Sequence, residues 1–279
     1  MQDKVVVITG ATSGIGRVAA RKLAAHGARI VLIARDSRRG QETLAELNAI
    51  APQVRHAAFY ADLSRMAEVK RVAAEISSNE SRVDILINNA GAVFSRRIVT
   101  EDGLERTFAL NHMSYFMLTA GLLDRVVAAA PSRIINTASN AHRNGHLDFD
   151  DLQSAKRYRP WTAYATSKLC NILFTRELAR RVAASGVSAN SFSPGFVATR
   201  FGDEAGGFHA LGLRIAKLFA ISEERGAETL MYLASSPDVE KISGEFFYKR
   251  RPGVLTEDAR NDALARRLWI ESERIAARL

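Results

Sequence analysis

The feature that most constrains this chain is an apolar run at residues 4–9, KVVVIT, that leads directly into the glycine loop TGATSGIGR. Gly10, Gly14 and Gly16 stand where a backbone must turn tightly and approach an anion closely. A helical pattern begins near Ile15, and the N–H groups and dipole of a helix N-terminus attract phosphate. The order strand, glycine loop, helix therefore predicts a βαβ unit that binds a dinucleotide pyrophosphate. A tight turn without a ligand is the alternative interpretation.

Short β-branched runs alternate with longer helical patterns along the chain. The strand-like segments are KVVVIT, ARIVLIAR, HAAFYADL, VDILINNAG, SRIINTAS, VSANSFSPG and GEFFY. The helical patterns include residues 15–26, 64–77, 104–129 and 162–184. Nearly continuous apolar strands suit a parallel sheet that is covered on both faces. We therefore expect an α/β, Rossmann-like doubly wound fold with a seven-stranded, mainly parallel sheet and helices on both faces.

The chain contains no repeat, low-complexity tract or linker that would divide it, so we expect residues 1–279 to form a single domain whose N-terminal half binds the cofactor. Two irregular segments, 142–160 and 196–222, follow the carboxyl ends of predicted strands. Ligands bind beyond those ends in doubly wound folds, so we expect these segments to form the substrate pocket. Ordinary surface loops are the alternative.

Charge and cysteine content narrow the classes of partner and location. The formal net charge of +9 is compatible with nucleic acid, an anionic membrane or a phosphate-bearing ligand. The basic residues are scattered and have no recognisable nucleic-acid module around them, so we expect no nucleic-acid partner. Cys170 is the only cysteine, which excludes an intrachain disulfide and favours a cytoplasmic location. No window reaches the ~20 apolar residues of a membrane span, and we expect no signal peptide.

Tyr164 and Lys168 are four residues apart in the helical pattern TAYATSKLCN. A phenol with an ordinary pKa of about 10 transfers protons poorly at neutral pH, and an ammonium on the same helix face favours the phenolate. We interpret the pair as catalytic, although a solvated helix face can carry the same spacing.

Two further polar residues join this pair as catalytic candidates. Ser139 ends the strand SRIINTAS, whose carboxyl end faces the same edge of the sheet, so its hydroxyl is predicted to bind a carbonyl oxygen. Asn111 lies in the helical pattern LNHMS, where an asparagine is a poor helix former and can connect Lys168 to solvent through water. Surface or helix-capping roles are the alternatives for each residue.

The second strand ends at Arg35, where a fold that selects NAD carries an Asp or Glu for the ribose hydroxyls. A guanidinium there suits a 2′-phosphate, and Arg38 and Arg39 are near enough in sequence to assist. We therefore predict NADP(H) in preference to NAD(H). This preference would weaken if the Asp36 carboxylate faced the ribose instead.

These residues fall into an ordered series of motifs across nearly the whole chain, and the sequence resembles the short-chain dehydrogenase/reductase family. The motifs are TGxxxGxG at residues 9–16, Asp62-Leu63, NNAG at 88–91, Asn111, Ser139, YxxxK at 164–168 and SPGFVAT at 193–199. The resemblance implies a catalytic core of Ser139, Tyr164 and Lys168, with Asn111 as its fourth member. Tyr164 would donate or accept a proton, and Ser139 would orient the carbonyl. Lys168 would lower the pKa of the tyrosine and hold the nicotinamide ribose. It also implies a homodimer or homotetramer through the helices after Asn111 and at Tyr164.

Together with Arg35, the resemblance gives a set of cofactor-binding residues. They are Gly10, Ser13, Gly14, Ile15, Gly16, Arg35, Asp62, Leu63, Asn89, Ala90, Gly91, Tyr164, Lys168, Pro194, Gly195, Val197 and Thr199.

A finer likeness is to the retinol dehydrogenase and protochlorophyllide reductase-like branch, which generally prefers NADP. It rests on the Ser-x-Ala-His run at residues 139–142, the long spacer from Ser139 to Tyr164, and the late Leu-Trp helix ARRLWIESERI. We expect an NADP(H)-dependent oxidoreductase that interconverts a carbonyl (ketone or aldehyde) and an alcohol on a hydrophobic or aromatic small molecule. Aromatic residues that favour such a substrate, or that belong to the core, are Phe149, Tyr158, Trp161, Phe196, Phe201 and Phe208.

Two other functions and a candidate metal site are the alternatives to this interpretation. A non-catalytic NADP(H)-sensing or scaffold protein would keep the fold, and a reductase of carbon–carbon double bonds or of a biosynthetic intermediate would use the same scaffold. His142 and His146 have the i, i+4 spacing of two metal ligands, but Gly145 disfavours a helix there and no third ligand is evident. We expect no metal.

Overall fold

The computed structural model describes residues 1–195 and 221–279. Predicted site residues Val197 and Thr199 lie outside these ranges, as does most of the second predicted pocket segment. The same holds for three of the aromatic residues considered for the substrate: Phe196, Phe201 and Phe208.

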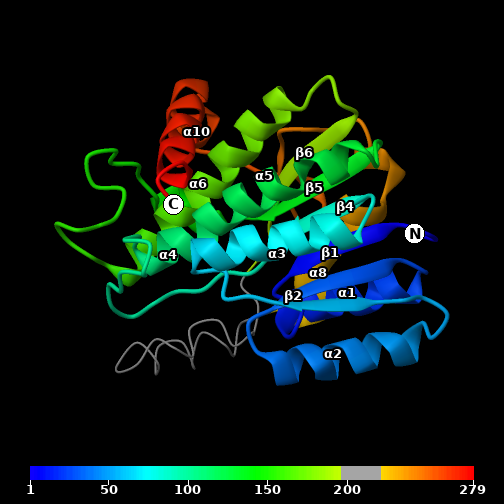
Figure 1. The fold of residues 1–279 in the computed structure, drawn as a ribbon. Coiled ribbons are helices and arrows are strands. Elements are labelled where there is room, and N and C mark those ends of the chain that lie inside the picture. The colour runs from blue at the N-terminus through cyan, green and yellow to red at the C-terminus, as the bar shows by residue number, and fades with distance from the viewer. Residues whose placement is uncertain (196–220) are drawn as a thin grey trace.

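Within the described residues, eight strands form one sheet in the order β3-β2-β1-β4-β5-β6-β7-β8 (Figure 1). They are β1 Val5–Thr9, β2 Arg29–Ala34, β3 Ala57–Tyr60, β4 Ile85–Asn88, β5 Ser132–Thr137, β6 Val187–Ser193, β7 Phe246–Tyr248 and β8 Arg251–Pro252. The first seven pair in parallel and correspond to the seven predicted strands. The predicted number of strands was one too low. Strand β8 has only two residues, which pair antiparallel with β7, and so short a strand shows no periodic pattern in the sequence.

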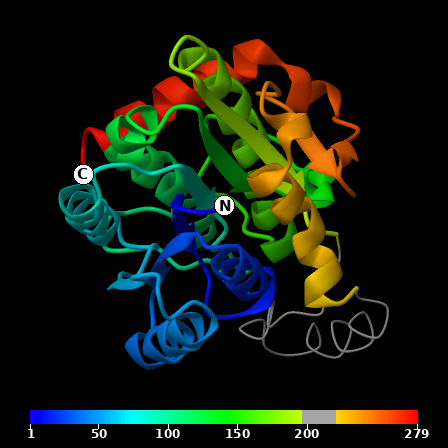
Figure 2. The ribbon, with the colours of Figure 1, turned by 90° about the vertical axis from the view of Figure 1, so that its right-hand side faces the viewer.

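Helices cover both faces of this sheet. Their bounds are α1 Gly14–Ala25, α2 Ser37–Ile50, α3 Met66–Asn79, α4 Arg106–Phe108, α5 Ser114–Val127, α6 Pro160–Arg181, α8 Glu223–Ser235, α9 Glu257–Arg260 and α10 Asp262–Ala276. Helices α1 and α8 bury their apolar faces in one core, and α3, α5, α6 and α10 share the other. Figure 2 shows this division from the side, with α1 and α8 in blue and gold opposite α3 and α5 in cyan and green. The two-sided cover confirms the predicted doubly wound fold.

The helical pattern predicted over 104–129 is interrupted. Glu105 caps the short helix α4 by accepting hydrogen bonds from the Thr107 and Phe108 amides at 2.8 and 2.9 Å. A π-helical turn, Ala109–Met113, then leads into α5. Such turns insert one residue into the helical ladder and are frequent at functional sites. This one contains Asn111.

Helix α6 is buried on nearly every side through its central turns, polar residues such as Ser167, Lys168 and Asn171 included. Helix α10 packs along it (Figure 1). The Trp269 indole of α10 stacks on the Phe174 ring of α6 at 5.7 Å between centroids and meets Phe116 of α5 edge-on at 5.0 Å. Part of the α5–α6 surface that the resemblance assigns to a second subunit is therefore covered by this chain's own C-terminal helix.

In residues 1–195 and 221–279, no helix is both long enough and apolar enough to cross a bilayer.

Candidate active site

A cavity of about 890 Å³ opens at the carboxyl ends of the central parallel strands. Its lining comprises residues 10, 12–16, 33–36, 39, 61–64, 89–93, 106, 110, 137–141, 161, 164, 168, 193–195 and 248. Every predicted catalytic or cofactor residue within the described ranges lies in this lining except Asn111. The parallel topology thus gathers residues that are more than 150 positions apart, such as Gly10 and Lys168, around one cavity.

The glycine loop forms the part of the cavity at the start of α1. Gly10 and Gly14 have φ angles of +68° and +58°, a region that favours glycine. A Cβ on Gly16 would lie 2.3 Å from the Gly10 carbonyl oxygen, so only glycine permits this approach. The Asn89 amide donates to the Thr9 carbonyl oxygen at 3.0 Å and holds the loop against β4. Ser13 precedes α1 without a capping side-chain bond, which leaves the helix N-terminus open toward an anion.

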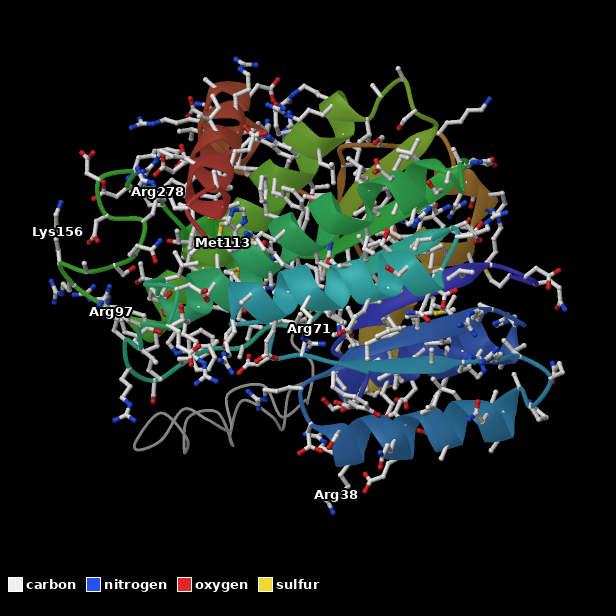
Figure 3. All side chains as sticks on the ribbon, viewed as in Figure 1. Arg38, Arg71, Arg97, Met113, Lys156 and Arg278 are labelled. Atoms are coloured by element: carbon white, nitrogen blue, oxygen red, sulfur yellow. The ribbon has the colours of Figure 1, made fainter. Side chains whose placement is uncertain are left out.

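The arginines after β2 divide into two groups. Arg35 and Arg39 line the cavity, and Arg39 also donates to the Thr12 carbonyl oxygen at 3.3 Å. The Arg38 side chain is 81% exposed and points away from the rest of the chain (Figure 3). The Asp36 carboxylate accepts a hydrogen bond from the Arg39 amide at 2.8 Å and so caps α2. This cap engages one oxygen of the carboxylate that competed with Arg35 in the sequence-based prediction, and Asp36 lines the cavity as well.

Ser139, Tyr164 and Lys168 line the same cavity and lie close to one another. The Ser139 hydroxyl is hydrogen-bonded to the Tyr164 side chain. The Lys168 ammonium lies 5.5 Å from the centre of the Tyr164 ring. All three therefore stand within one small polar patch at the ends of β5 and α6.

Burial controls the ionisation of this patch. It raises the pKa of Tyr164 well above its ordinary value, and the hydrogen bond with Ser139 acts in the opposite direction. Burial also lowers the pKa of Lys168 to about 7. The upward shift of Tyr164 is opposite to the one expected from Lys168, because removal of both groups from water outweighs their mutual attraction.

Asn111 is fully buried behind the cavity wall. Its side-chain oxygen accepts from the Ala92 amide at 2.9 Å, and its amide donates to the Ala92 carbonyl and the Ser167 hydroxyl, both at 3.0 Å. The side chain therefore joins the loop after β4 to α6. The proton-relay role expected from the sequence stays a prediction.

Sequence reasoning missed a buried polar ladder beneath the site. Asn88 donates to Asn136 at 2.9 Å, and Asn136 donates to Thr175 at 3.0 Å. Asn171 and Lys168 both donate to the Thr137 carbonyl oxygen. Asparagines inside otherwise apolar strands were the available signal, since buried amides require partners.

Other lining residues were missed as well: Val93, Arg106, Leu110 and Tyr248. Of the aromatic residues proposed for the substrate, Trp161 lines the cavity, whereas Tyr158 hydrogen-bonds the Phe94 carbonyl at 2.9 Å. Phe149 lies beneath the Arg267 guanidinium at 4.0 Å. Among the described residues, the lining includes none from 142–160, so the pocket role of that segment stays a prediction.

The two histidines considered for a metal have different surroundings. His142 is fully buried, and the His146 side chain is 79% exposed. Within residues 1–195 and 221–279, no group of three or more His, Cys, Asp or Glu side chains is arranged to hold a metal ion.

Comparison with known proteins identifies the family of this chain. The model of the short chain dehydrogenase family matches residues 4–208. The chain belongs to the short-chain dehydrogenase family. It is therefore an oxidoreductase by family.

The similarity of this short-chain dehydrogenase to individual relatives extends over nearly the whole chain. It is 38% identical to Retinol dehydrogenase 13 of Homo sapiens over 278 residues, which cover 98% of this chain and 84% of that protein. The predicted resemblance to the retinol dehydrogenase-like branch is thus confirmed.

Solved structures agree with the fold of this short-chain dehydrogenase. An uncharacterized protein from Mycobacterium Paratuberculosis has a TM-score of 0.79 and 31% identity, with 99% of this chain and 94% of that chain covered. L-Sorbose reductase from Gluconobacter frateurii, solved with NADPH and L-sorbose, has a TM-score of 0.71 and 25% identity, with 88% and 95% covered.

Proposed function

We propose that this chain is an NADP(H)-dependent oxidoreductase that interconverts a ketone or aldehyde and the corresponding alcohol, with Tyr164 as general acid and base. The observation that carries the proposal is the hydrogen bond between the Ser139 hydroxyl and the Tyr164 side chain, beside Lys168 in the cavity that the glycine loop lines. The retinol dehydrogenase relatives support a carbonyl and alcohol pair as substrate and product.

The proton chemistry follows from burial. A phenol whose pKa is raised is protonated at neutral pH and is suited to donate a proton to a carbonyl oxygen. The Ser139 hydroxyl, already bonded to this phenol, is placed to bind the same oxygen. Lys168, with its pKa lowered to about 7, gains or loses its charge near neutrality. When charged, it favours the phenolate that the reverse reaction requires.

The residues present fit a dinucleotide with an added phosphate. The tight approach of Gly16 to Gly10 forms a cradle that a side chain would fill, and the open N-terminus of α1 faces it. Arg35 and Arg39 supply positive charge at the end of β2, where a 2′-phosphate would be bound. When bound, the nicotinamide supplies or accepts the hydride. The solved complex of L-sorbose reductase with NADPH supports the choice of nucleotide.

The proposed substrate is hydrophobic or aromatic. Trp161 is 43% exposed at the cavity and packs edge-on against the Tyr164 ring at 6.1 Å between centroids. Val93 and Leu110 add apolar surface to the same lining. These side chains favour an apolar group next to the reacting carbonyl.

Two measurements test the proposal. Titration with NADPH and NADH, followed by nicotinamide fluorescence, is expected to show tighter binding of NADPH. A panel of hydrophobic aldehydes and ketones is then expected to be reduced by the wild type, and Tyr164→Phe to lose roughly 10²- to 10⁴-fold in kcat while it binds NADPH normally. Normal turnover by Tyr164→Phe would contradict the mechanism. Nucleotide binding without turnover of any carbonyl, alcohol or activated alkene would favour an NADP(H)-sensing or scaffold protein instead.

The assembly state is a separate part of the proposal. A homodimer or homotetramer through α5 and α6, as the resemblance implies, must form beside α10 or displace it, because Trp269 already covers Phe116 and Phe174. Analytical ultracentrifugation of the full chain measures the assembly state. A Trp269→Glu variant, which loosens α10, is expected to raise the dimer fraction if the dimer displaces α10, and an unchanged fraction would contradict that displacement.

A further inference from the structure

The turn that follows β5 contains a histidine for which the proposed reaction has no direct use. Residues Asn140–Asn144 form a 3₁₀ turn, and His142 within it is fully buried. Its backbone amide and its Nδ1 both approach the Ser139 carbonyl oxygen, at 3.1 and 2.7 Å. Because that oxygen only accepts, Nδ1 carries the proton and donates it. His142 therefore closes the turn on Ser139 with two hydrogen bonds.

The rest of the ring of His142 is held by packing. It meets the Phe246 ring edge-on at 5.1 Å between centroids, and Nε2 is buried without a hydrogen-bond partner among the described residues. Burial lowers the pKa of His142, so the ring is neutral at pH 7. The side chain is thus fixed in a single tautomer whose one donor reaches Ser139.

The far end of the same turn is seated on α6. A Cβ on Gly145 would lie 2.5 Å from the Ala165 carbonyl oxygen, so the two backbones approach as closely as only glycine allows. The Thr166 hydroxyl donates to the His146 carbonyl oxygen at 3.0 Å. These contacts fall on the two residues that directly follow Tyr164.

The contacts at the two ends of this turn together determine the distance between Ser139 and Tyr164. Ser139 accepts a bond from the Ala141 amide at 3.1 Å through its hydroxyl oxygen, and its carbonyl is held by His142. The seat of Gly145 on Ala165 sets how near this turn comes to Tyr164. Misplacement of a reacting group by about 1 Å can cost about 10²-fold in rate.

We propose that His142 and Gly145 are positioning residues that together fix the separation between the Ser139 hydroxyl and the Tyr164 phenol. The proposal rests on the proposed function, in which these two groups bind the same carbonyl oxygen. Neither residue touches that oxygen; each acts through the turn between β5 and α6.

A matched pair of variants isolates the hydrogen bond to Ser139. His142→Asn keeps a side-chain N–H near the position of Nδ1, whereas His142→Leu fills similar space without a donor. We expect His142→Leu to lower kcat about tenfold or more, with the KM for the carbonyl and the dissociation constant for NADPH changed less than about threefold. His142→Asn is expected to keep kcat within about threefold of the wild type. Arg143→Ala, an exposed neighbour in the same turn, serves as control.

A second readout does not depend on turnover. Tyrosine labelled with ¹³C at Cζ gives a Tyr164 resonance that is assigned by its loss in Tyr164→Phe. We expect this resonance to move in His142→Leu and in Gly145→Ala and to stay in place in His142→Asn and Arg143→Ala. If the wild type reduces no carbonyl, the proposed function fails while the resonance still tests the positioning.

Three results would overturn the inference. The first is a folded His142→Leu enzyme with unchanged kcat and an unmoved Tyr164 resonance. The second is equal loss of activity in His142→Asn and His142→Leu, which would show that the donor is irrelevant. The third applies if His142→Leu does not fold: Gly145→Ala then decides, and a folded Gly145→Ala with unchanged kcat and resonance contradicts the role of the seat on α6.

Discussion

The Lys168 ammonium donates a 2.8 Å hydrogen bond to the main-chain oxygen of Thr137, the last residue of β5. This bond ties helix α6 to the sheet at the point where the catalytic groups meet. Lys168 is also buried there, and removal of its ammonium from water lowers its pKa to about 7. The site therefore carries an electrostatic cost that affects the stability of the whole chain.

Replacement of Lys168 by Met is expected to stabilise the protein without added nucleotide. The folded pKa lies below the ordinary value of 10.5, so the unfolded chain binds more protons between pH 7 and 10.5, and wild-type stability rises with pH across that window. Lys168→Met removes this dependence and should raise Tm by at least about 2–4 °C at pH 7, the shift that ~1 kcal/mol gives in a chain of this size. Calorimetry at pH 7 and 9 measures both effects, with exposed Lys241→Met as control. A Tm that falls equally at both pH values would contradict the prediction.

Arg35 and Arg38 provide a matched test of nucleotide choice. Arg35 lines the cavity and Arg38 points to solvent. A charge-assisted hydrogen bond is worth ~1.5–3 kcal/mol, so Arg35→Ala should lower kcat/KM for NADPH roughly 10- to 100-fold. The value for NADH should change far less, and Arg38→Ala should leave both nearly unaltered. Equal losses with the two nucleotides would remove Arg35 as the selector.

Gly16→Ala tests the glycine loop. The added Cβ would stand 2.3 Å from the Gly10 oxygen and 2.6 Å from the Asn89 amide nitrogen, so the loop must move away from β4. We expect nucleotide affinity to fall by about tenfold or more, because the phosphate-binding N–H groups move with the loop. Fluorescence titration with NADPH measures the affinity, and circular dichroism checks that the variant is folded. Unchanged affinity would show that the loop does not bind the nucleotide.

The ionisation of Asp84, away from the active site, should make the free energy of unfolding fall in acid. Burial opposes its ionisation, but hydrogen bonds from the Val5 amide, Lys4 and Arg82 prevail and lower its pKa. Its stabilising effect is thus present above the unfolded pKa of about 3.9 and is lost as the pH falls through the lower folded value. Asp84→Asn should cost about 1–3 kcal/mol at pH 7 and progressively less below pH ~4. Urea unfolding at several pH values measures this.

An exposed ion pair supplies the control for Asp84. Arg71 and Glu75 interact at 2.7 Å on the surface of α3, with both side chains more than 40% exposed. Glu75→Gln should cost no more than about 0.5 kcal/mol at pH 7. A cost for Asp84→Asn that does not change with pH would show that the carboxylate contributes by packing rather than by charge.

The sequence by itself determined the strands and the identity of most site residues. The signals were local: apolar β-branched runs for β1 to β7, glycines at a strand end, and a Tyr–Lys spacing of one helical turn. Parallel pairing then requires that the residues after each strand meet at one edge of the sheet, so chain order alone predicts that Ser139 and Tyr164 lie near each other. Strand β8 was not predicted, because a strand of two residues shows no alternation of apolar and polar side chains.

Only the tertiary structure decided what surrounds each group. Proximity on a helix predicted that Lys168 lowers the pKa of Tyr164, but the shift depends on how completely both are removed from water, which no local pattern records. Other features likewise depend on which segments the fold brings into contact. They are the cavity position of Arg39 beside an exposed Arg38, the hydrogen bonds of Asn111 to Ala92, and the bond from His142 to Ser139. Chain order fixes which residues follow each strand, whereas burial and hydrogen-bond partners arise only when distant segments pack together.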